Sequence, residues 1–139
     1  MGDACDCESV LVVLHIKDQE DNIELMREAR SAYCPYSRFR VGAAVLCTDG
    51  SIVRGCKIEN ASYGLTICAE RTAIFSAVAQ CKTPVACIAS AYTDPDTLKI
   101  PCGACRQVIA EFLLDDALVH VAGVGTMTVG ELLPRAFRL

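Results

Sequence analysis

The chain has 139 residues, a formal net charge of −4 and a sequence pI of about 5.1. The length predicts one domain spanning residues 1–139, and the acidic balance argues against a polynucleotide partner, because proteins that track phosphates present a basic patch or stripe. With 53% hydrophobic residues and a mean hydropathy of +0.34, the composition hints at apolar surface that is buried between subunits.

The first 20 residues are predicted to contain neither a secretory signal nor a membrane span. An apolar run at 10–16 follows Asp3, Asp6 and Glu8, where a signal peptide would be basic, and the run is too short to cross a bilayer. The ten cysteines fall below the density of a disulfide scaffold. We therefore expect a reduced, cytoplasmic protein with no membrane partner, whose thiols bind metal or pack in the core.

The predicted elements begin with a helix over 21–33, where an acidic helix start is followed by apolar residues at helical spacing. Pro35 ends this helix, because the residue before a proline is pushed out of the α region. Two strands follow, over 39–47 and 52–58. They are joined at Asp49-Gly50, which is a strong hairpin signal.

The second half of the chain alternates helix and strand. Helices are predicted over 68–79 and 102–114 from their apolar patterns. Short apolar runs predict a buried strand over 85–92 and another over 118–122, and a short final helix is predicted over 129–133. This alternation after a hairpin predicts an α/β layer sandwich with a mixed sheet.

Two short motifs bring three thiols together at the spacing of metal ligands. They are Cys68-Ala69-Glu70 and Pro101-Cys102-Gly103-Ala104-Cys105. A structural zinc site closes its shell with four protein ligands, whereas a catalytic site keeps three and leaves a position for water. Zinc deaminases use three cysteines, or one histidine and two cysteines, with a glutamate that is not a ligand as general acid/base. The motifs therefore predict zinc held by Cys68, Cys102 and Cys105, with Glu70 as the catalytic residue.

Both ligand clusters are predicted at the N-terminal ends of helices, where backbone N–H groups and the helix dipole lower thiol pKa values. Zinc binds thiolate, so this placement favours metal loading at neutral pH. Three thiolates would leave a negative centre, which weakens the power of the ion to acidify a water molecule. Arg71, one helical turn from Cys68, is predicted to donate to a thiolate and offset that charge.

Glu70, two positions after Cys68, is suited to acid/base catalysis. It would take a proton from water that the ion activates, deliver it to a ring nitrogen of the substrate and later help ammonia leave. This combination suits hydrolytic removal of an exocyclic amine from an amidine-like ring carbon. A small neutral or cationic substrate fits the acidic balance of the chain.

A longer set of motifs surrounds these residues. It consists of Ser31-Ala32-Tyr33-Cys34-Pro35-Tyr36-Ser37 with Phe39, Val41-Gly42-Ala43-Ala44, Gly55-Cys56 with Ile58-Glu59-Asn60-Ala61, Cys68-Ala69-Glu70-Arg71-Thr72-Ala73, the run from Pro101 to Val108, and Glu131-Leu132-Leu133-Pro134. On these residues the chain resembles the small, single-domain, homotetrameric cytidine deaminases over about residues 22–137, while residues 1–20 match nothing in that family. The resemblance implies a three-layer α/β/α sandwich with a mixed sheet, one Zn²⁺ per subunit of a homotetramer, and conversion of cytidine and 2′-deoxycytidine to uridine and 2′-deoxyuridine plus ammonia, as in pyrimidine salvage.

The resemblance also implies substrate contacts. It assigns them to Phe39, Lys57, Glu59, Asn60, Ala69 and Phe137. The Ala69 backbone and the Glu70 side chain would meet the pyrimidine, Glu59 would meet the ribose 3′-hydroxyl, and Phe137 would reach a neighbouring subunit's site. Without the resemblance, Phe39 and Phe137 would be assigned to the core, and Glu59 would be as well explained as a solvated strand residue.

Three features depart from the family pattern. The family usually has asparagine at the position of Lys57, where it shares the ribose contact with Glu59. Lysine can donate but not accept, and at i, i+2 on a strand it can pair with Glu59 instead, which concerns sugar affinity and not the deamination chemistry. Residues 64–66 differ from the usual Pro-Leu-Gly-like run, and the segment 119–128 is shortened, which predicts the loss of an edge strand.

Other interpretations stay open. Cys34 or Cys56 could close the metal shell of a non-catalytic, zinc-stabilised binding module. A deaminase could act on a related cytosine nucleoside of the blasticidin type, with Lys57 reshaping the sugar side. A polynucleotide editor is disfavoured by the acidic balance and by the absence of a basic stripe. His15 and His120 are predicted to be packing or surface residues, and the seven remaining cysteines small core residues.

Overall fold

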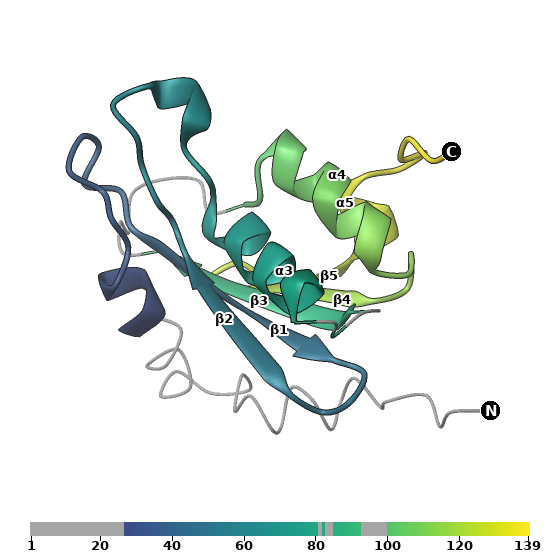
Figure 1. Cartoon of the computed structure of the whole chain (residues 1–139). Coiled ribbons are helices and arrows are strands. Elements are labelled where there is room, and N and C mark those ends of the chain that lie inside the picture. Colours follow the sequence, from purple (N-terminus) through teal and green to yellow (C-terminus); the bar gives the residue numbers. More distant parts are fainter. Residues whose placement is uncertain (1–26, 81, 83–84, 93–99) are drawn as a thin grey trace.

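The computed structural model of the chain describes residues 27–80, 82, 85–92 and 100–139. Within these ranges five strands form one sheet in the order β2-β1-β3-β4-β5, and α3 and α4 run across it (Figure 1). Neighbouring strands are antiparallel except for β3 and β4, which are parallel. The predicted α/β class with a mixed sheet is therefore confirmed.

The predicted hairpin is formed by β1 (Val41–Cys47) and β2 (Ile52–Cys56). At its turn Asp49 Oδ1 accepts hydrogen bonds from the backbone N–H and the hydroxyl of Ser51, at 2.9 and 2.5 Å. Gly50 has φ +84°, a left-handed conformation that costs glycine little. Asp49 and Gly50 therefore form the hairpin turn, as the sequence predicts.

The remaining elements include the predicted helices and strands in their predicted order, together with η1 and β5, which were not predicted. They are a 3-10 turn η1 (Tyr63–Leu65), α3 (Ala69–Ala79), β3 (Val85–Tyr92), α4 (Gly103–Phe112), β4 (Leu118–Val121), β5 (Gly125–Thr128) and α5 (Val129–Leu132). The two long helices begin one residue later than predicted, because Cys68 and Cys102 are their N-caps and have extended backbone conformations. Two ligand candidates therefore stand at the boundary between loop and helix.

The predicted loss of an edge strand is wrong. β5 pairs antiparallel with β4, with Leu118 opposite Thr128 and Val121 opposite Gly125. The connection between them is tight: Val124 N donates to Val121 O at 3.0 Å, and Gly123 has φ +79°. The shortened segment therefore tightens the turn and keeps the strand.

One face of the sheet is in backbone contact with α3. Ala69, Ala73 and Ala77 recur every fourth residue and are fully buried, so this side of the helix carries only methyl groups. Opposite them on β2 lies Gly55, where a Cβ atom would stand 2.3 Å from the backbone N of Ala73. The alanines of α3 and Gly55 of β2 therefore set the short distance between the helix and the sheet.

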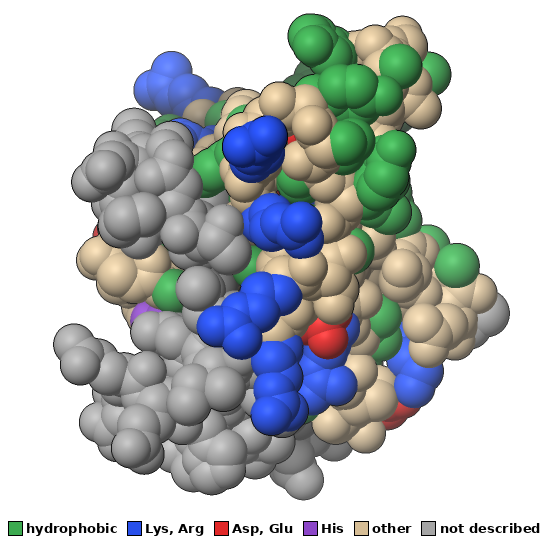
Figure 2. All heavy atoms as spheres, turned by 90° about the vertical axis from the view of Figure 1, so that its left-hand side faces the viewer, with side chains coloured by type: hydrophobic (Ala, Val, Ile, Leu, Met, Phe, Trp, Pro, Cys, Tyr) green, Lys and Arg blue, Asp and Glu red, His purple; other side chains and the backbone are tan. Residues whose placement is uncertain are grey.

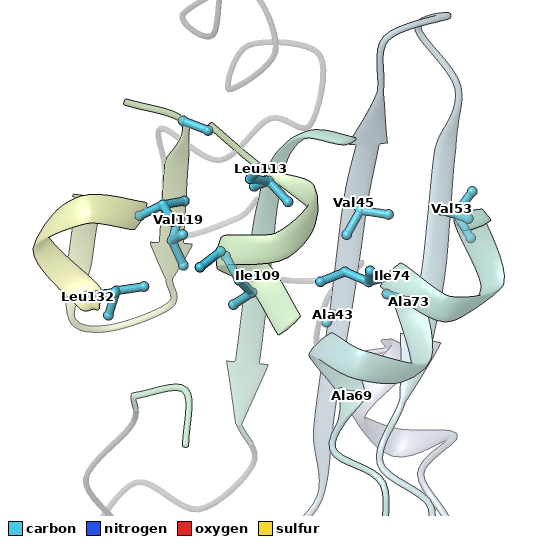
Figure 3. Close-up of a cluster of buried hydrophobic side chains, with 14 of the residues drawn as sticks. Ala43, Val45, Val53, Ala69, Ala73, Ile74, Ile109, Leu113, Val119 and Leu132 are labelled. Atoms are coloured by element: carbon cyan, nitrogen blue, oxygen red, sulfur yellow. The ribbon is translucent and has the colours of Figure 1, made fainter. Parts of the chain in front are cut away.

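The core between sheet and helices is filled by aliphatic side chains. Ile74 of α3 and Ile109 of α4 are both fully buried and lie in one cluster with Val45 and Val119 from the strands (Figure 3). Replacing such a residue by alanine costs about 2–5 kcal/mol. This shared core fixes α3 relative to α4, and hence the start of one helix relative to the start of the other.

The opposite face of the sheet contacts the N-terminal part of the described chain at β2. Arg54 and Cys56 alternate with Gly55 along β2 and so point away from α3; Cys56 Sγ donates to Ser31 O at 3.8 Å, and Arg54 Nε lies 3.9 Å from Glu28 Oε1. A helical turn at 27–30 therefore lies on this face, which supports the three-layer arrangement. Of the predicted helix over 21–33, residues 21–26 lie outside the described part of the chain.

Candidate metal centre

Three sulfur atoms converge where two helices begin. Cys68 is the N-cap of α3, Cys102 is the N-cap of α4, and Cys105 lies in the first turn of α4. The Sγ atoms of Cys68 and Cys102 are 3.9 Å apart, those of Cys102 and Cys105 are 3.4 Å apart, and all three lie within 4.8 Å of one another. Tetrahedral Zn²⁺ with Zn–S lengths of about 2.3 Å requires sulfurs roughly 3.8 Å apart. The donor set and its spacing therefore fit zinc.

The surroundings favour a thiolate at Cys68. A hydrogen bond from Cys105, followed by donation and charge from Arg71, lowers the pKa of Cys68 to about 5, although burial opposes the shift. The pKa of Cys105 is raised by its hydrogen bond with Cys68, by burial and by the Glu70 carboxylate. Cys68 therefore ionises before Cys105, and a cation held among the sulfurs would favour the thiolate form of the ligands.

Glu70 and Arg71 both contact the sulfur cluster from the first turn of α3. Glu70 is only 3% exposed, and its Oε2 accepts from Cys105 Sγ at 3.8 Å. Arg71 directs Nη2 at Cys68 Sγ, 3.5 Å away. The cluster thus has a buried carboxylate and a guanidinium beside it, as predicted from the residues that follow Cys68.

The alternative ligands Cys34 and Cys56 lie in other contacts. Cys34 Sγ donates to Phe39 O at 3.2 Å, and Cys56 Sγ bonds to Ser31 O. Burial raises the pKa of both thiols, which disfavours the thiolate that zinc requires. Among the residues that the structure describes, the group able to hold a metal contains only the three predicted cysteines.

A second polar group is built around the buried carboxylate of Glu59. Oε2 accepts from the backbone N–H groups of Tyr36 and Ser37 at 3.0 and 3.2 Å, while Oε1 accepts from the Ser37 hydroxyl. Oε1 also lies 3.1 Å from Lys57 Nζ, so the predicted pairing of Lys57 with Glu59 is present. The Ser37 hydroxyl, then the two backbone N–H groups and Lys57, lower the pKa of Glu59 to about 2.

Lys57 is held on every side of its ammonium group. Besides the ion pair, Nζ lies 3.3 Å from Ser37 Oγ and 3.2 Å from Phe39 O. It also stands 5.0 Å from the centroid of the Phe39 ring, a cation–π distance. Phe39, Lys57 and Glu59 are therefore brought together, as three of the predicted substrate residues.

A short backbone pairing connects this group with the sulfur cluster. Ile58 and Ile67 exchange N–H···O hydrogen bonds at 3.0 Å in both directions, which makes an antiparallel pair. In that register the next residues outward are Lys57 and Cys68. The Glu59 carboxylate group therefore flanks the candidate metal ligands.

The other predicted site residues lie in different surroundings. Asn60 is exposed, and its Oδ1 accepts from Ser62 N at 2.8 Å in a local turn. Ala69 is fully buried in α3. Phe137 is 68% exposed, and its carbonyl accepts from Gln107 Nε2 at 3.0 Å. The described chain therefore gives Phe137 no contact with the sulfur cluster.

His120 is a packing residue, as predicted. Its Nδ1 lies 2.9 Å from Thr126 Oγ1 across the β4–β5 pair, and burial lowers its pKa. His15 lies outside the described residues. The sequence interpretation did not assign a role to Arg106, whose Nε donates to Pro101 O at 2.8 Å and whose Nη1 donates to Leu132 O at 3.0 Å. Arg106 thereby fixes the residue before Cys102, and its place one position after Cys105 was the signal available.

Basic side chains gather on one face, although the sequence analysis found no basic stripe. Figure 2 shows a row of Lys and Arg side chains down one face of the molecule. A net charge of −4 conceals this arrangement, because it averages over the whole surface. In the described ranges, no helix has the length and apolar character needed to span a bilayer.

The chain is similar to known proteins, both to a family as a whole and to individual relatives. The family model described as the cytidine and deoxycytidylate deaminase zinc-binding region matches residues 16–121. A cytidine deaminase from Halalkalibacterium halodurans is 50% identical over 118 residues, which cover 82% of this chain and 89% of the relative. A cytidine deaminase from Sporosarcina psychrophila is 46% identical over 125 residues, covering 86% of this chain and 91% of the relative.

The fold of this chain is also similar to that of solved cytidine deaminase structures. The crystal structure of cytidine deaminase from Burkholderia pseudomallei superposes with a TM-score of 0.75 at 42% identity, covering 86% of this chain and 99% of that chain. The cytidine deaminase from Mycobacterium tuberculosis also gives a TM-score of 0.75, at 39% identity, covering 88% of this chain and 100% of that chain.

Proposed function

This chain belongs to the cytidine and deoxycytidylate deaminase family, and we propose that it hydrolyses cytidine and 2′-deoxycytidine to uridine and 2′-deoxyuridine with release of ammonia. The observation that carries the proposal is the buried Glu70 carboxylate in contact with a cluster of three sulfur atoms. A carboxylate that is not a ligand, beside three thiolate donors, is the arrangement of the zinc deaminases.

One Zn²⁺ per chain would be held by Cys68, Cys102 and Cys105. When bound, the ion would act as a Lewis acid and lower the pKa of a water molecule toward neutrality. Among the described residues the cluster offers three sulfur donors and no fourth. This donor count matches the open shell of catalytic zinc sites and differs from the closed shell of structural ones.

Glu70 would carry the protons of the reaction. Its Oε2 can take a proton from the attacking water and deliver it to the ring nitrogen beside the amine-bearing carbon. The second proton of that water then passes to the amine, the carbon–nitrogen bond breaks, and ammonia leaves. Because Glu70 is buried against Cys105, it is held next to the reacting carbon and shielded from bulk water.

Arg71 would balance the charge of the thiolates. Three thiolates around a divalent ion leave a net charge of −1, and the Arg71 guanidinium donates to one of them, Cys68, at 3.5 Å. A hydrogen bond from a cation withdraws electron density from the sulfur. The bound ion would then remain a stronger Lewis acid than three unshielded thiolates allow.

The substrate would lie between the sulfur cluster and the Glu59 carboxylate group. We propose that the Ala69 backbone and Glu70 meet the pyrimidine and that Phe39 lies beside the base, with Glu59 and Asn60 on the sugar side. The pairing of Ile58 with Ile67 supports this placement, because it sets the Glu59 group next to Cys68. A nucleoside whose ring reaches the sulfur cluster would then extend its sugar toward residues 57–60.

A homotetramer is proposed from the apolar surface near this site. Tyr63 is 75% exposed, Leu65 and Phe75 are also exposed, and hydrophobic side chains gather at the top of the face in Figure 2. Ile58, Leu65 and Phe75 line a groove of about 390 Å³. Apolar area of this kind favours burial against another copy, and the exposed Phe137 would reach a neighbouring site. Light scattering coupled to size-exclusion chromatography would give the mass of the assembly.

The cytoplasmic location is also a proposal. It is supported by free thiols at Cys34, Cys47, Cys56, Cys68, Cys102 and Cys105. Thiols persist in reducing compartments, whereas oxidising ones favour disulfides. Fractionation of cells that express the tagged chain would test it.

The decisive experiment is a turnover assay on zinc-loaded protein. Cytidine and 2′-deoxycytidine should each yield one ammonia per uridine or 2′-deoxyuridine formed. Glu70→Gln should keep about one zinc per chain and lose roughly 10²–10⁴-fold or more in kcat, which is the usual range for general acid–base catalysis. Glu111→Gln, a charge-matched change at an exposed position of α4, should have no effect. Full activity of Glu70→Gln would refute the assignment.

The row of basic side chains favours a second candidate, an enzyme that acts on cytosine in single-stranded polynucleotides. A positive face can track phosphates and would retard DNA or RNA at low salt. A gel-shift assay with single-stranded oligonucleotides at 20 mM salt tests this function. Absence of retardation, together with turnover of free nucleosides, would dismiss it.

A further inference from the structure

The Glu59 carboxylate accepts as many hydrogen bonds as its two oxygens can take. An ionised carboxylate offers about four lone-pair positions. Here Oε2 receives the N–H groups of Tyr36 and Ser37, and Oε1 receives the Ser37 hydroxyl and the Lys57 ammonium. A hydroxyl group of a substrate therefore finds no open acceptor position on Glu59.

Lys57 supplies the last of the four donors to the Glu59 carboxylate. Its three N–H bonds point at Glu59 Oε1, Ser37 Oγ and Phe39 O, at 3.1, 3.3 and 3.2 Å. An ammonium group has three donors and no acceptor, so Lys57 has neither a spare donor nor a lone pair to offer a ligand. The Ser37 hydroxyl is equally committed, because it donates to Glu59 and accepts from Phe39 N at 3.0 Å.

The hydrogen-bonded group of Glu59, Lys57 and Ser37 lies on the side of the sulfur cluster where the proposed function places the sugar of a nucleoside. Lys57 is next to Cys68 in the register of the Ile58–Ile67 pair. A sugar hydroxyl could reach the carboxylate only by displacing a donor. The bond from Lys57 is charge-assisted, and such bonds are roughly twice as strong as neutral ones. Exchange of the ammonium for a neutral hydroxyl is therefore unfavourable.

We propose that Lys57 determines sugar specificity by occupying the acceptor position of Glu59 that a sugar 3′-hydroxyl would use, so that this protein discriminates only weakly against cytosine nucleosides that lack the hydroxyl. The inference rests on the proposed deamination of cytosine nucleosides. It makes Glu59 a support for the loop 36–39 and gives the protein tolerance toward altered sugars.

The test compares 2′-deoxycytidine with 2′,3′-dideoxycytidine, which differ only in the 3′-hydroxyl. A site built to bond a hydroxyl rejects the analogue that lacks it by about 10⁴–10⁵-fold. For zinc-loaded wild-type protein we expect kcat/KM for the two substrates to differ by less than tenfold. A difference of tenfold or more overturns the proposal, because Glu59 or another group then reads the hydroxyl with Lys57 in place.

Substitutions of Lys57 test whether this residue causes the weak discrimination between the two substrates. Lys57→Asn frees a lone pair of Glu59 and adds an amide that can accept, so the preference for the substrate with the hydroxyl should rise at least tenfold. Lys57→Met removes the ammonium with little change in length and serves if the asparagine variant does not fold. Lys82→Asn is the matched control, since Lys82 bridges Asp49 and Ser51 at 3.6 and 3.0 Å in the hairpin. An unchanged preference in a folded Lys57 variant contradicts the proposal.

Failure of the proposed function is a separate outcome. If zinc-loaded protein turns over neither nucleoside, that function fails, and binding then decides the inference. Calorimetry with 2′-deoxyuridine and 2′,3′-dideoxyuridine should give Kd values within tenfold of each other in the wild type. A larger difference, or no binding of either compound, overturns the role of Lys57.

Discussion

Gly55→Ala should damage both stability and activity, although Gly55 touches no substrate. The added Cβ would lie 2.3 Å from Ala73 N, 2.8 Å from Ala73 Cα and 2.9 Å from Thr72 C. These are backbone atoms of α3, so no side chain can rotate away. Ordinary contact begins at 3.4 Å, and the helix must therefore move by about 1.1 Å from β2. Overpacking of this kind costs about 1–3 kcal/mol, which for this length corresponds to a fall in Tm on the order of 5–10 °C.

The same displacement reaches the site, because Ala73 is one turn from Glu70 along α3. A misplacement of about 1 Å at a catalytic group costs roughly 10²-fold in rate. Thermal unfolding followed by circular dichroism, and kcat/KM for 2′-deoxycytidine, would measure the two effects. Gly64→Ala is the matched control, since a Cβ at Gly64 meets nothing within 4 Å. A Gly55→Ala protein with Tm within 2 °C and kcat/KM within twofold of the wild type would refute the packing argument.

Three further predictions concern the charged residues and the metal. Arg71→Gln should lower turnover more than zinc content, because the arginine acts on a ligand that zinc still holds; metal analysis beside kinetics checks this, and an unchanged rate in the zinc-replete variant would remove the role. A strong chelator should abolish turnover and lower Tm, and added Zn²⁺ should restore both. The folded pKa of Glu59, about 2, lies below the ordinary value of about 4.5. Its contribution to stability is thus present above pH 4.5 and lost as pH falls through 2. The difference in Tm between metal-free wild type and Glu59→Gln should therefore shrink over that range, and a constant difference would contradict it.

The sequence predicted those features that depend on nearby residues. The hairpin turn needs only Asp49 and Gly50, and the pairing of Lys57 with Glu59 follows from their i, i+2 spacing. The cluster of three sulfurs was also predictable, because two short motifs carry all three thiols. Local structure of this kind is kept in the folded chain, because the tertiary contacts favour the same conformation as the local sequence.

Features that depend on distant partners were missed. The hydrogen bonds that Tyr36 and Ser37 donate to Glu59 span 23 and 22 positions of the chain, respectively, and no pattern in the sequence relates these residues. The edge strand β5 (GTMT) shows no alternation of apolar and polar residues. It forms because its backbone pairs with that of β4. The row of Lys and Arg side chains in Figure 2 could not be foreseen either, because the net charge averages over the whole surface.

The separation of the ligands along the chain has a consequence for biosynthesis. Cys68 leaves the ribosome first, and Cys105 follows 37 positions later, an interval of roughly 2–7 s at about 5–20 residues per second. A nascent chain that ends before Cys102 carries only one of the three proposed ligand sulfurs, that of Cys68. Uptake of the proposed zinc ion would therefore have to wait until the start of the second helix has been synthesised.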